Sequence, residues 1–390
     1  MLLNIKSNFA FLMVSGLLLQ NANALEVDRE VMPRITVGGQ VIATADDYGY
    51  SKNLPSNHDD NVSTDDSALL LRFDKHMYGV ESGVAGGVIG FREFSGKVVF
   101  HQLNAFYWNK NIEFQIGKTR LRNTIIELPT LRDEDLLDYS HVNTASSDEE
   151  FDQLYGSNVS LDWYLDQANQ SLGIWAGSRN NDVNHSSGPN SFDTNGVRYN
   201  YQPPEDLQYL NRIRHAGILI DSQRVQTGAV DEWMQSVVAG IEFNLNINPT
   251  SSWSMGVQAI SNAGVDSATD LSTVSSRALS KSTAQIISLR YTRRPQLLTR
   301  WQVAIVVASK KYDKVSNAKN TSLLVNYTYR LGQGVNIITQ VKQTDYSNDI
   351  NSGNDETLIQ IGMSFQFDSV FNNTIGKRNS ILNLEHGYIQ

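Results

Sequence analysis

The strongest constraint on the fold is a strict alternation of apolar and polar side chains in the segment Thr321–Thr344, TSLLVNYTYRLGQGVNIITQVKQT. Alternate side chains of a β-strand point to opposite faces, so the pattern predicts one apolar and one polar face. The apolar set is Leu323, Val325, Tyr327, Tyr329 and Leu331, and the polar set includes Ser322, Asn326, Thr328 and Arg330. Gly332-Gln333-Gly334 then reverses the chain, because glycine adopts the positive φ that tight hairpins require. The segment is therefore predicted to be a β-hairpin.

The same alternation recurs along most of the chain, in segments of roughly ten residues, which is the length that crosses a bilayer as a tilted strand. Clear examples are the segments Ser157–Asp166, Trp233–Ile247 and Thr357–Phe367. The apolar faces must either pack against one another, as in a soluble sandwich, or face lipid.

The connections favour lipid, because short turns alternate with long polar loops. Four long loops are expected, at 45–66, 121–156, 180–208 and 262–282. Tight periplasmic turns with long external loops are typical of outer-membrane barrels, and aromatic residues near strand ends fit interfacial girdles. The sequence predicts an all-β fold, a transmembrane antiparallel up-and-down β-barrel of about 16 strands. A β-helix or a sandwich array is disfavoured, since no repeat of fixed period is visible.

Two countings both give sixteen strands, and bacterial barrels use even numbers. In the first, Arg212–Val230 holds two short strands and the barrel closes at Thr357–Phe367. In the second, that region holds one strand and Ser380–Tyr388 closes the barrel. We expect the second counting, because an even number leaves no orphan edge.

The amino terminus, residues 1–24, has the pattern of a secretory signal peptide. Lys6 supplies the positive charge, Phe9–Leu19 the apolar run, and Ala22-Asn23-Ala24 the small-x-small cleavage site. The apolar run is too short for a spanning helix. We expect Sec-type cleavage near Ala24 and insertion of residues 25–390 as a barrel into the outer membrane of a Gram-negative cell, with outer-membrane lipid as a partner.

Motifs for catalysis or cofactor binding are missing from the sequence. It has no GxSxG, HExxH or Walker motif, and no cysteine that could act as a nucleophile or soft metal ligand. The seven histidines share no ligand spacing. A pI near 5.3 argues against a nucleic-acid partner. We expect no enzymatic activity, no cofactor and no metal, and a small-molecule solute as the partner.

If the apolar faces meet lipid, the opposite faces line a lumen whose charged side chains set which solutes pass. The predicted inward cations are Arg72, Arg290, Arg330 and Lys342, and the predicted inward carboxylates are Asp74, Glu113, Asp162 and Glu242. Mixed signs predict no simple rule for anions or cations. In the alternative interpretation, these charges only pair with one another and solvate the wall.

The segment Ile116–Tyr139, IGKTRLRNTIIELPTLRDEDLLDY, leaves an early strand with a cluster of cations and then becomes acidic. Its charged candidates are Lys118, Arg120, Arg122, Arg132, Asp133, Glu134 and Asp135. The loop 121–156 is a candidate constriction loop, which would fold into the lumen and create a transverse field. The alternative is an exposed external loop with a short amphipathic helix.

This segment, on an early strand, resembles the LbtU family of siderophore porins, as does the terminal His386-Gly387-Tyr388. The resemblance implies an outer-membrane barrel that takes up a ferric siderophore without the TonB system. Energised siderophore receptors have 22 strands and a plugged lumen, and this chain is too short for both. Passage should therefore be diffusive.

Two other functions stay open from the sequence. One is a general or anion-type porin without a role in iron uptake, and the other is an outer-membrane adhesin. Porins of this size are often trimers, so a homotrimer is one assembly that the sequence allows. No stretch of the chain marks a subunit contact.

Overall fold

The computed structural model describes nineteen stretches of the chain, within which all structural statements below are made. They are residues 34–51, 61–64, 67–77, 83–94, 97–120, 125–126, 155–165, 170–179, 194–201, 212–227, 230–248, 250–264, 277, 280–294, 299–313, 318–332, 335–347, 350 and 354–371. The predicted signal peptide and Ser380–Tyr388 lie outside these residues.

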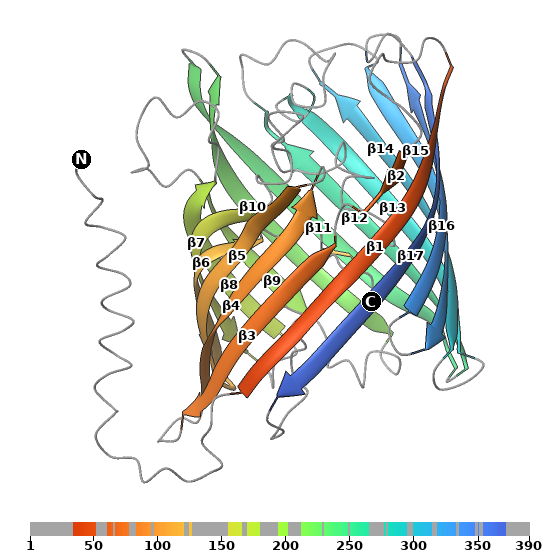
Figure 1. Ribbon diagram of the computed structural model, residues 1–390. Helices are drawn as coiled ribbons and strands as arrows, with labels where there is room; N and C mark the ends of the chain where they lie inside the picture. Colours follow the sequence, from red (N-terminus) through yellow and green to blue (C-terminus); the bar gives the residue numbers. More distant parts are fainter. Residues whose placement is uncertain are drawn as a thin grey trace.

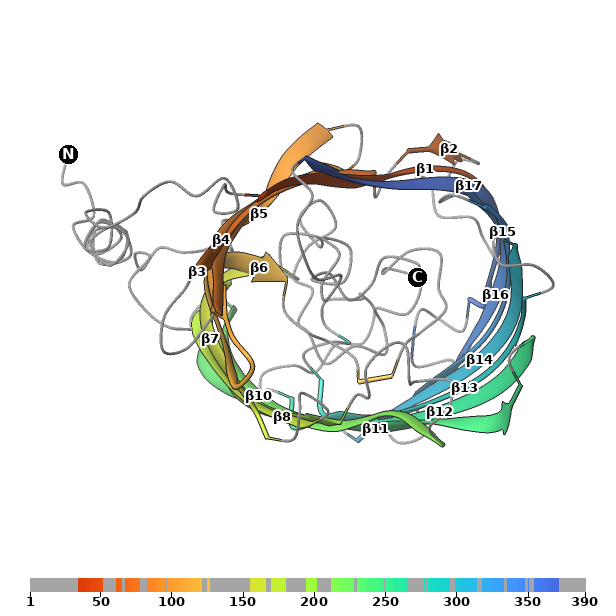
Figure 2. The same ribbon diagram turned by 90° about the horizontal axis from the view of Figure 1, so that it is seen from below.

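The described strands form one antiparallel sheet that closes on itself as a barrel (Figures 1 and 2). The strands are β1 (Arg34–Tyr50), β2 (Asn61–Ser63), β3 (Ala68–Met77), β4 (Gly83–Phe94), β5 (Lys97–Trp108), β6 (Ile112–Arg120), β7 (Tyr155–Tyr164), β8 (Gln170–Arg179), β9 (Thr194–Tyr201), β10 (Ile213–Thr227), β11 (Val230–Ile247), β12 (Ser251–Asn262), β13 (Ser282–Arg293), β14 (Arg300–Tyr312), β15 (Lys319–Gly332), β16 (Val335–Tyr346) and β17 (Glu356–Phe371). The short β2 only adds to β1. The other sixteen form the wall, which confirms the predicted barrel and its strand number.

The barrel closes between β17 and β1, whose register runs from Ile35 opposite Phe371 to Tyr50 opposite Glu356. The other edge of β1 pairs with β3. The expectation that Ser380–Tyr388 closes the barrel is therefore wrong. The closing strand is the Thr357–Phe367 segment of the first counting, because both of its edges are paired.

Neither counting includes one of the strands of the wall. The region Arg212–Val230 holds the single strand β10, as in the second counting. The sixteenth wall strand is β9, within the 180–208 segment that was expected to be a loop. Three outward side chains, Val197, Tyr199 and Tyr201, give β9 a short apolar pattern, and its pairing with both β8 and β10 holds it in the wall. The loop expected at 45–66 is also partly wrong, since β1 continues to Tyr50.

The two faces of the wall follow the alternation of the sequence. On β15, Leu323, Val325 and Tyr327 are exposed on the outside, whereas Ser322 and Asn326 on the alternate positions are buried inside. Apolar exposure outside a closed sheet is what a lipid-facing wall requires. The predicted faces of the hairpin are confirmed. The described residues contain no helix with the length and hydrophobicity needed to cross a membrane.

The connections are sorted between the two ends of the barrel. At the end where β1 begins and β17 ends, five connections have at most five residues: 78–82, 109–111, 165–169, 248–250 and 333–334 (Figure 1). The connections 202–212 and 294–299 lie at the same end. At the opposite end lie the long connections 121–154, 180–193 and 263–281, together with the short ones 95–96 and 228–229. We call these the short-turn end and the long-loop end.

Candidate functional site

The inner wall of the barrel carries the candidate site, and the exposure of its inward side chains varies along the strands. Near the long-loop end several inward side chains are almost fully buried: Arg92, Thr194, Gln223, Tyr312, Asn320 and Thr344. Near the short-turn end several inward side chains are only half-buried: Glu113, Tyr164, Arg198, Arg214, Arg300 and Arg330. We call this second set the short-turn vestibule. Other inward side chains near the short-turn end are buried, as at Thr36, Asp74 and Asn336, and near the long-loop end Lys342 and Glu356 are half-buried. The half-buried side chains of the short-turn vestibule are therefore the part of the wall at this end that solvent contacts.

Arg72 and Asp74 form an ion pair on the inner face of β3, with 2.8 Å between Nε and Oδ2. The Arg72 guanidinium also lies 4.8 Å from the ring centroid of Phe106 on β5, in a cation–π contact. Both charged side chains are buried. Their charges are compensated locally, so this pair stabilises the wall more than it attracts solutes.

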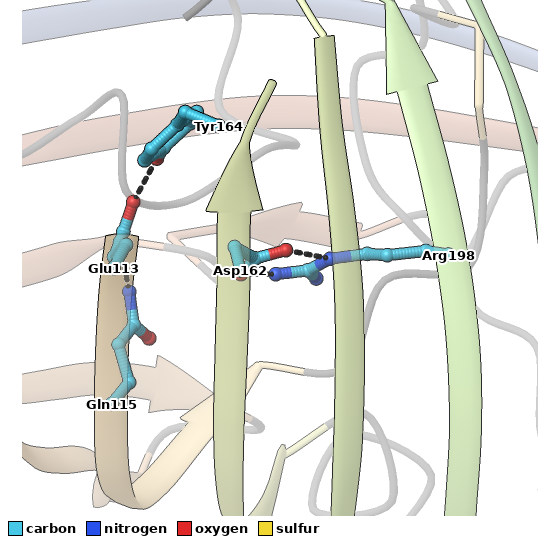
Figure 3. A network of polar contacts seen from close by, with 5 residues as sticks. All are labelled: Glu113, Gln115, Asp162, Tyr164 and Arg198. Carbon is cyan, nitrogen blue, oxygen red and sulfur yellow. Dashed lines mark hydrogen bonds and ion pairs between the residues drawn. The ribbon is translucent and has the colours of Figure 1, made fainter. Parts of the chain in front are cut away.

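Asp162 on β7 and Arg198 on β9 pair across the strand that separates them (Figure 3). Arg198 Nε donates to Asp162 Oδ1 at 2.9 Å, and Arg198 Nη2 donates to Asp162 Oδ2. Gly173 on β8 is the cross-strand neighbour of both residues. A Cβ at Gly173 would lie 2.1 Å from Asp162 Oδ1. The glycine therefore leaves room for a bidentate ion pair to run over β8.

Glu113 at the start of β6 holds two polar neighbours beside this pair (Figure 3). Its carboxylate accepts a hydrogen bond from the Tyr164 hydroxyl and one from Gln115 Nε2 at 2.6 Å. Together with the ion pair, these residues form a polar network on β6–β9. Its inward carboxylates are Glu113 and Asp162 and its cation is Arg198.

On the strands that follow β9, the carboxylate of Glu242 pairs with two arginines. Arg214 Nη1 on β10 lies 3.1 Å from Glu242 Oε1 on β11, and Arg290 Nη1 on β13 lies 4.0 Å from the same oxygen. Arg290 and Glu242 are buried, whereas Arg214 is half-buried. This part of the wall therefore combines two cations with one anion.

A row of amides crosses the wall on β15, β16 and β17. Asn326 Nδ2 donates to Gln340 Oε1 at 3.3 Å, and Gln340 Nε2 donates to Gln360 Oε1 at 2.7 Å. Gln360 is opposite Asp46 on β1. Side-chain pairs of this kind fix the register of neighbouring strands. The row also explains why these inward amides tolerate burial, since each has a hydrogen-bond partner.

Two residues of the connection between β6 and β7, Ile125 and Ile126, are buried against the inner wall. Their backbone N–H groups both donate to Gln258 Oε1 on β12, at 2.7 and 3.3 Å. Their side chains pack with inward apolar residues of β10–β15, which are Leu219, Val238, Ile260, Ala284, Ile286, Val306, Ala308 and Leu324. The dipeptide therefore lies inside the barrel.

Three glycines make the seat for this dipeptide. Gly217 and Gly240 are cross-strand neighbours on β10 and β11, and Gly256 follows on β12. A Cβ at Gly240 would lie 3.0 Å from Ile125 Cβ and 3.2 Å from Ile126 Cγ2. At Gly217 and Gly256 a Cβ would come within 3.2 Å of one of the two isoleucines. Any larger residue at Gly240 would therefore compete with the dipeptide for space.

The predicted site residues divide into four groups. Arg72 and Arg290 are buried on the inner wall, and Arg330 and Lys342 are half-buried there, with Lys342 Nζ 4.0 Å from Glu356 Oε1. Lys118 is opposite the exposed Leu103 and donates from Nζ to the Phe100 carbonyl at 3.0 Å, which does not support a pore-lining position. Arg120 ends β6, and its side chain is not described. Arg122, Arg132, Asp133, Glu134 and Asp135 lie outside the described residues.

Sequence reasoning missed Arg198, Arg214 and Arg300 as inward cations. Arg198 lies on β9, within the segment 180–208 whose sequence predicts a loop. Arg214 sits at an irregularity between Ile213 and His215, where simple alternation fails. Arg300 begins β14 and lies two residues before the buried Gln302, so the alternation of that strand puts it on the inward face. Within the described part of the chain, no three His, Cys, Asp or Glu side chains are grouped to hold a metal ion.

Solved structures of outer-membrane porins share this fold. The anion-selective porin from Comamonas acidovorans has a TM-score of 0.59 and 12% identity, over 86% of this chain and 100% of its own. The outer membrane channel DcaP of Acinetobacter baumannii has a TM-score of 0.56 and 13% identity, over 86% and 97%. The trimer form of the Vibrio cholerae outer membrane protein OmpT has a TM-score of 0.55 and 10% identity, over 86% and 99%.

At these identities the similarity shows the porin fold alone. No protein-family model and no curated protein sequence matches the chain. The resemblance to the LbtU family is therefore not confirmed.

Proposed function

We propose that the protein is an outer-membrane porin that gives small solutes diffusive passage. The observation that carries the proposal is a closed sixteen-strand wall with exposed apolar side chains outside and charged and amide side chains inside. Its location in the Gram-negative outer membrane, after signal cleavage near Ala24, is part of the same proposal. The similarity in fold to porins and channels of three bacteria supports it.

The test is the conductance of purified protein in a planar bilayer. We expect discrete conductance steps from protein whose folding is verified by heat-modifiable gel migration. Folded protein that inserts without any conductance would contradict a porin function and would favour an adhesin.

The loop 121–156 is proposed to enter the lumen and narrow it. Support comes from Ile125 and Ile126, which are held on the inner wall by Gln258 and by the glycine seat.

For the solute we propose a ferric siderophore taken up without TonB, on the strength of the LbtU-like segment at 116–139. The measurement is siderophore-dependent growth of a deletion strain under iron limitation, compared with the same strain carrying the gene. Equal growth of both strains would favour the second candidate, a general or anion-type porin. That candidate is favoured by the two arginines that share Glu242 and by the fold of an anion-selective porin.

A homotrimer is proposed as the assembly, because the similar Vibrio cholerae protein is described as a trimer. Molar mass in detergent, measured by light scattering coupled to size exclusion, distinguishes a trimer from a monomer.

A further inference from the structure

We infer that Arg300 and Arg330 form an anion-binding site in the short-turn vestibule, which binds a carboxylate or phosphate group of a solute at the mouth of the lumen. The inference rests on the proposed porin function, and it names the chemical class of solute that this end of the barrel attracts.

The register between β14 and β15 brings the two arginines together. Arg300 on β14 and Arg330 on β15 are direct cross-strand partners. Directly opposed residues on one face of an antiparallel pair have Cβ atoms about 5 Å apart, and like charges in this arrangement destabilise a sheet. An anion bound between them removes that repulsion.

Both side chains lie on the inner face. Arg300 Nη2 donates to Oε1 of the buried inward residue Gln302 at 2.6 Å. Arg330 is opposite Asn336, a buried inward residue that donates to Ser364 Oγ at 3.1 Å. Both arginines are half-buried, whereas Arg72 and Arg290 are fully buried. Arg300 and Arg330 are therefore the inward arginines of β14 and β15 that a solute can reach.

The level of the site is marked by aromatic side chains on the outer face. Trp301 follows Arg300 in the sequence, and Tyr329 precedes Arg330. The two aromatic residues are themselves cross-strand partners. The Trp301 ring packs on Tyr291 with centroids 5.2 Å apart, and Tyr291 packs on Trp253 at 4.7 Å. Such clusters occupy the membrane–water interface of barrels. Arg300 and Arg330 are thus at the mouth and not at the middle of the wall.

Charges on the neighbouring strands reinforce the attraction. Among the described inward residues of β10–β15 near the short-turn end, the cations are Arg214, Arg290, Arg300 and Arg330, and Glu242 is the carboxylate. The opposite wall, on β3–β9, carries Asp74, Glu113 and Asp162 with Arg72 and Arg198. The vestibule therefore has a transverse polarity, with its positive side at β10–β15.

The chemistry suits oxyanions in particular. A guanidinium presents planar N–H donors that bind carboxylate and phosphate in a bidentate manner. Two guanidinium groups side by side offer donors to two or three oxygens of one phosphate. Chloride is a single atom and cannot accept hydrogen bonds in this geometry.

The experiment uses the full-length protein folded in detergent. Calorimetric titration with inorganic phosphate, and separately with citrate, measures binding to the unaltered protein and to Arg300→Gln/Arg330→Gln. The control is Arg293→Gln/Arg294→Gln, which removes two exposed arginines at the adjacent turn. Reversal potentials in a KCl gradient, and block of conductance by phosphate added to each side in turn, give an independent readout for the same three proteins.

We expect phosphate or citrate affinity to fall at least about tenfold in Arg300→Gln/Arg330→Gln, since charge-assisted hydrogen bonds are lost. The reversal potential should shift towards cations, and block from one side should disappear. Arg330→Lys should keep the selectivity for anions but weaken phosphate binding, because the charge stays and the planar fork is lost. The citrate and phosphate arms show which oxyanion the site prefers.

Oxyanion affinity that is equal in the unaltered protein and in Arg300→Gln/Arg330→Gln would overturn the site, as would the absence of binding to the unaltered protein. Binding that is lost in this variant, in a protein that conducts no ions, would support the site and overturn the porin function. The two proposals therefore fail in different ways.

Discussion

The Asp162 carboxylate pairs with the Arg198 guanidinium from two strands away, over the backbone of Gly173. Adjacent strands of a sheet normally bring cross-strand side chains together. Here a strand lies between the partners, and the pair forms because the intervening residue has no side chain. The same device recurs where Trp175 lies over Gly196 and where Ile125 lies over Gly240. Glycines on the inner wall thus decide which long side chains lie flat against it.

The ion pair predicts the effect of Gly173→Ala. A Cβ at this position would displace the Asp162 carboxylate and disrupt its contact with Arg198. We expect the free energy of unfolding to fall by about 1–3 kcal/mol, because a largely buried charged group loses its partner. Urea unfolding of the protein in lipid vesicles measures it. Gly49→Ala is the control, since a Cβ at Gly49 meets its neighbours at ordinary distances of 3.8 Å or more. Equal free energies of unfolding for the two variants would show that the Asp162–Arg198 ion pair accommodates the added methyl group without a loss of stability.

The glycine seat predicts that Gly240→Val widens the lumen. The valine side chain occupies the space of Ile125 and Ile126, so the dipeptide leaves the wall and its connection no longer narrows the channel. Single-channel conductance should rise, and Gln258→Ala should raise it in the same direction by removing the acceptor of both backbone N–H groups. A conductance identical to that of the unaltered channel in both variants would place the constriction elsewhere.

The charges of the loop give a third prediction. Neutralising Arg120, Arg122 and Arg132 together should shift the ion selectivity towards cations if the loop 121–156 lines the lumen. The measurement is the reversal potential in a salt gradient. An unchanged reversal potential would put this loop outside the route of the ions. Lys118→Gln is the comparison, because Lys118 is opposite the exposed Leu103 and should leave the selectivity unaltered.

The direction of the apolar face gives a fourth prediction, for Val325→Arg on the outer face of β15. A charge facing the middle of a bilayer should lower the free energy of unfolding by about 2–4 kcal/mol, whereas near the interface the cost is about 0–1 kcal/mol. Thr321→Arg, further along the same strand towards the long-loop end, is the matched comparison. Unfolding by guanidinium from lipid vesicles measures both. Similar costs at the two positions would mean that Val325 does not face lipid.

Much of the architecture could be predicted because the alternation of β-strands is local. The faces of β15 and the sorted connections can be read from neighbouring residues, and they predict a barrel of sixteen strands. The strand β9 escaped prediction because its apolar face is short, with Val197, Tyr199 and Tyr201, and its other support comes from pairing with β8 and β10. The inward cations on regular strands, such as Arg72 and Arg290, follow the alternation, whereas Arg214 lies at an irregularity.

The sequence by itself determined which side of each ribbon is apolar, because neighbouring side chains on a strand must point in opposite directions. It also determined that the chain has no cysteine to join distant segments, so that strand pairing has to hold the barrel together. Only the tertiary structure decided that β17 meets β1, that Arg198 reaches Asp162, and that Arg300 is opposite Arg330. These relationships depend on the register between strands, and register is set by contacts along the whole closed sheet, which no local pattern contains.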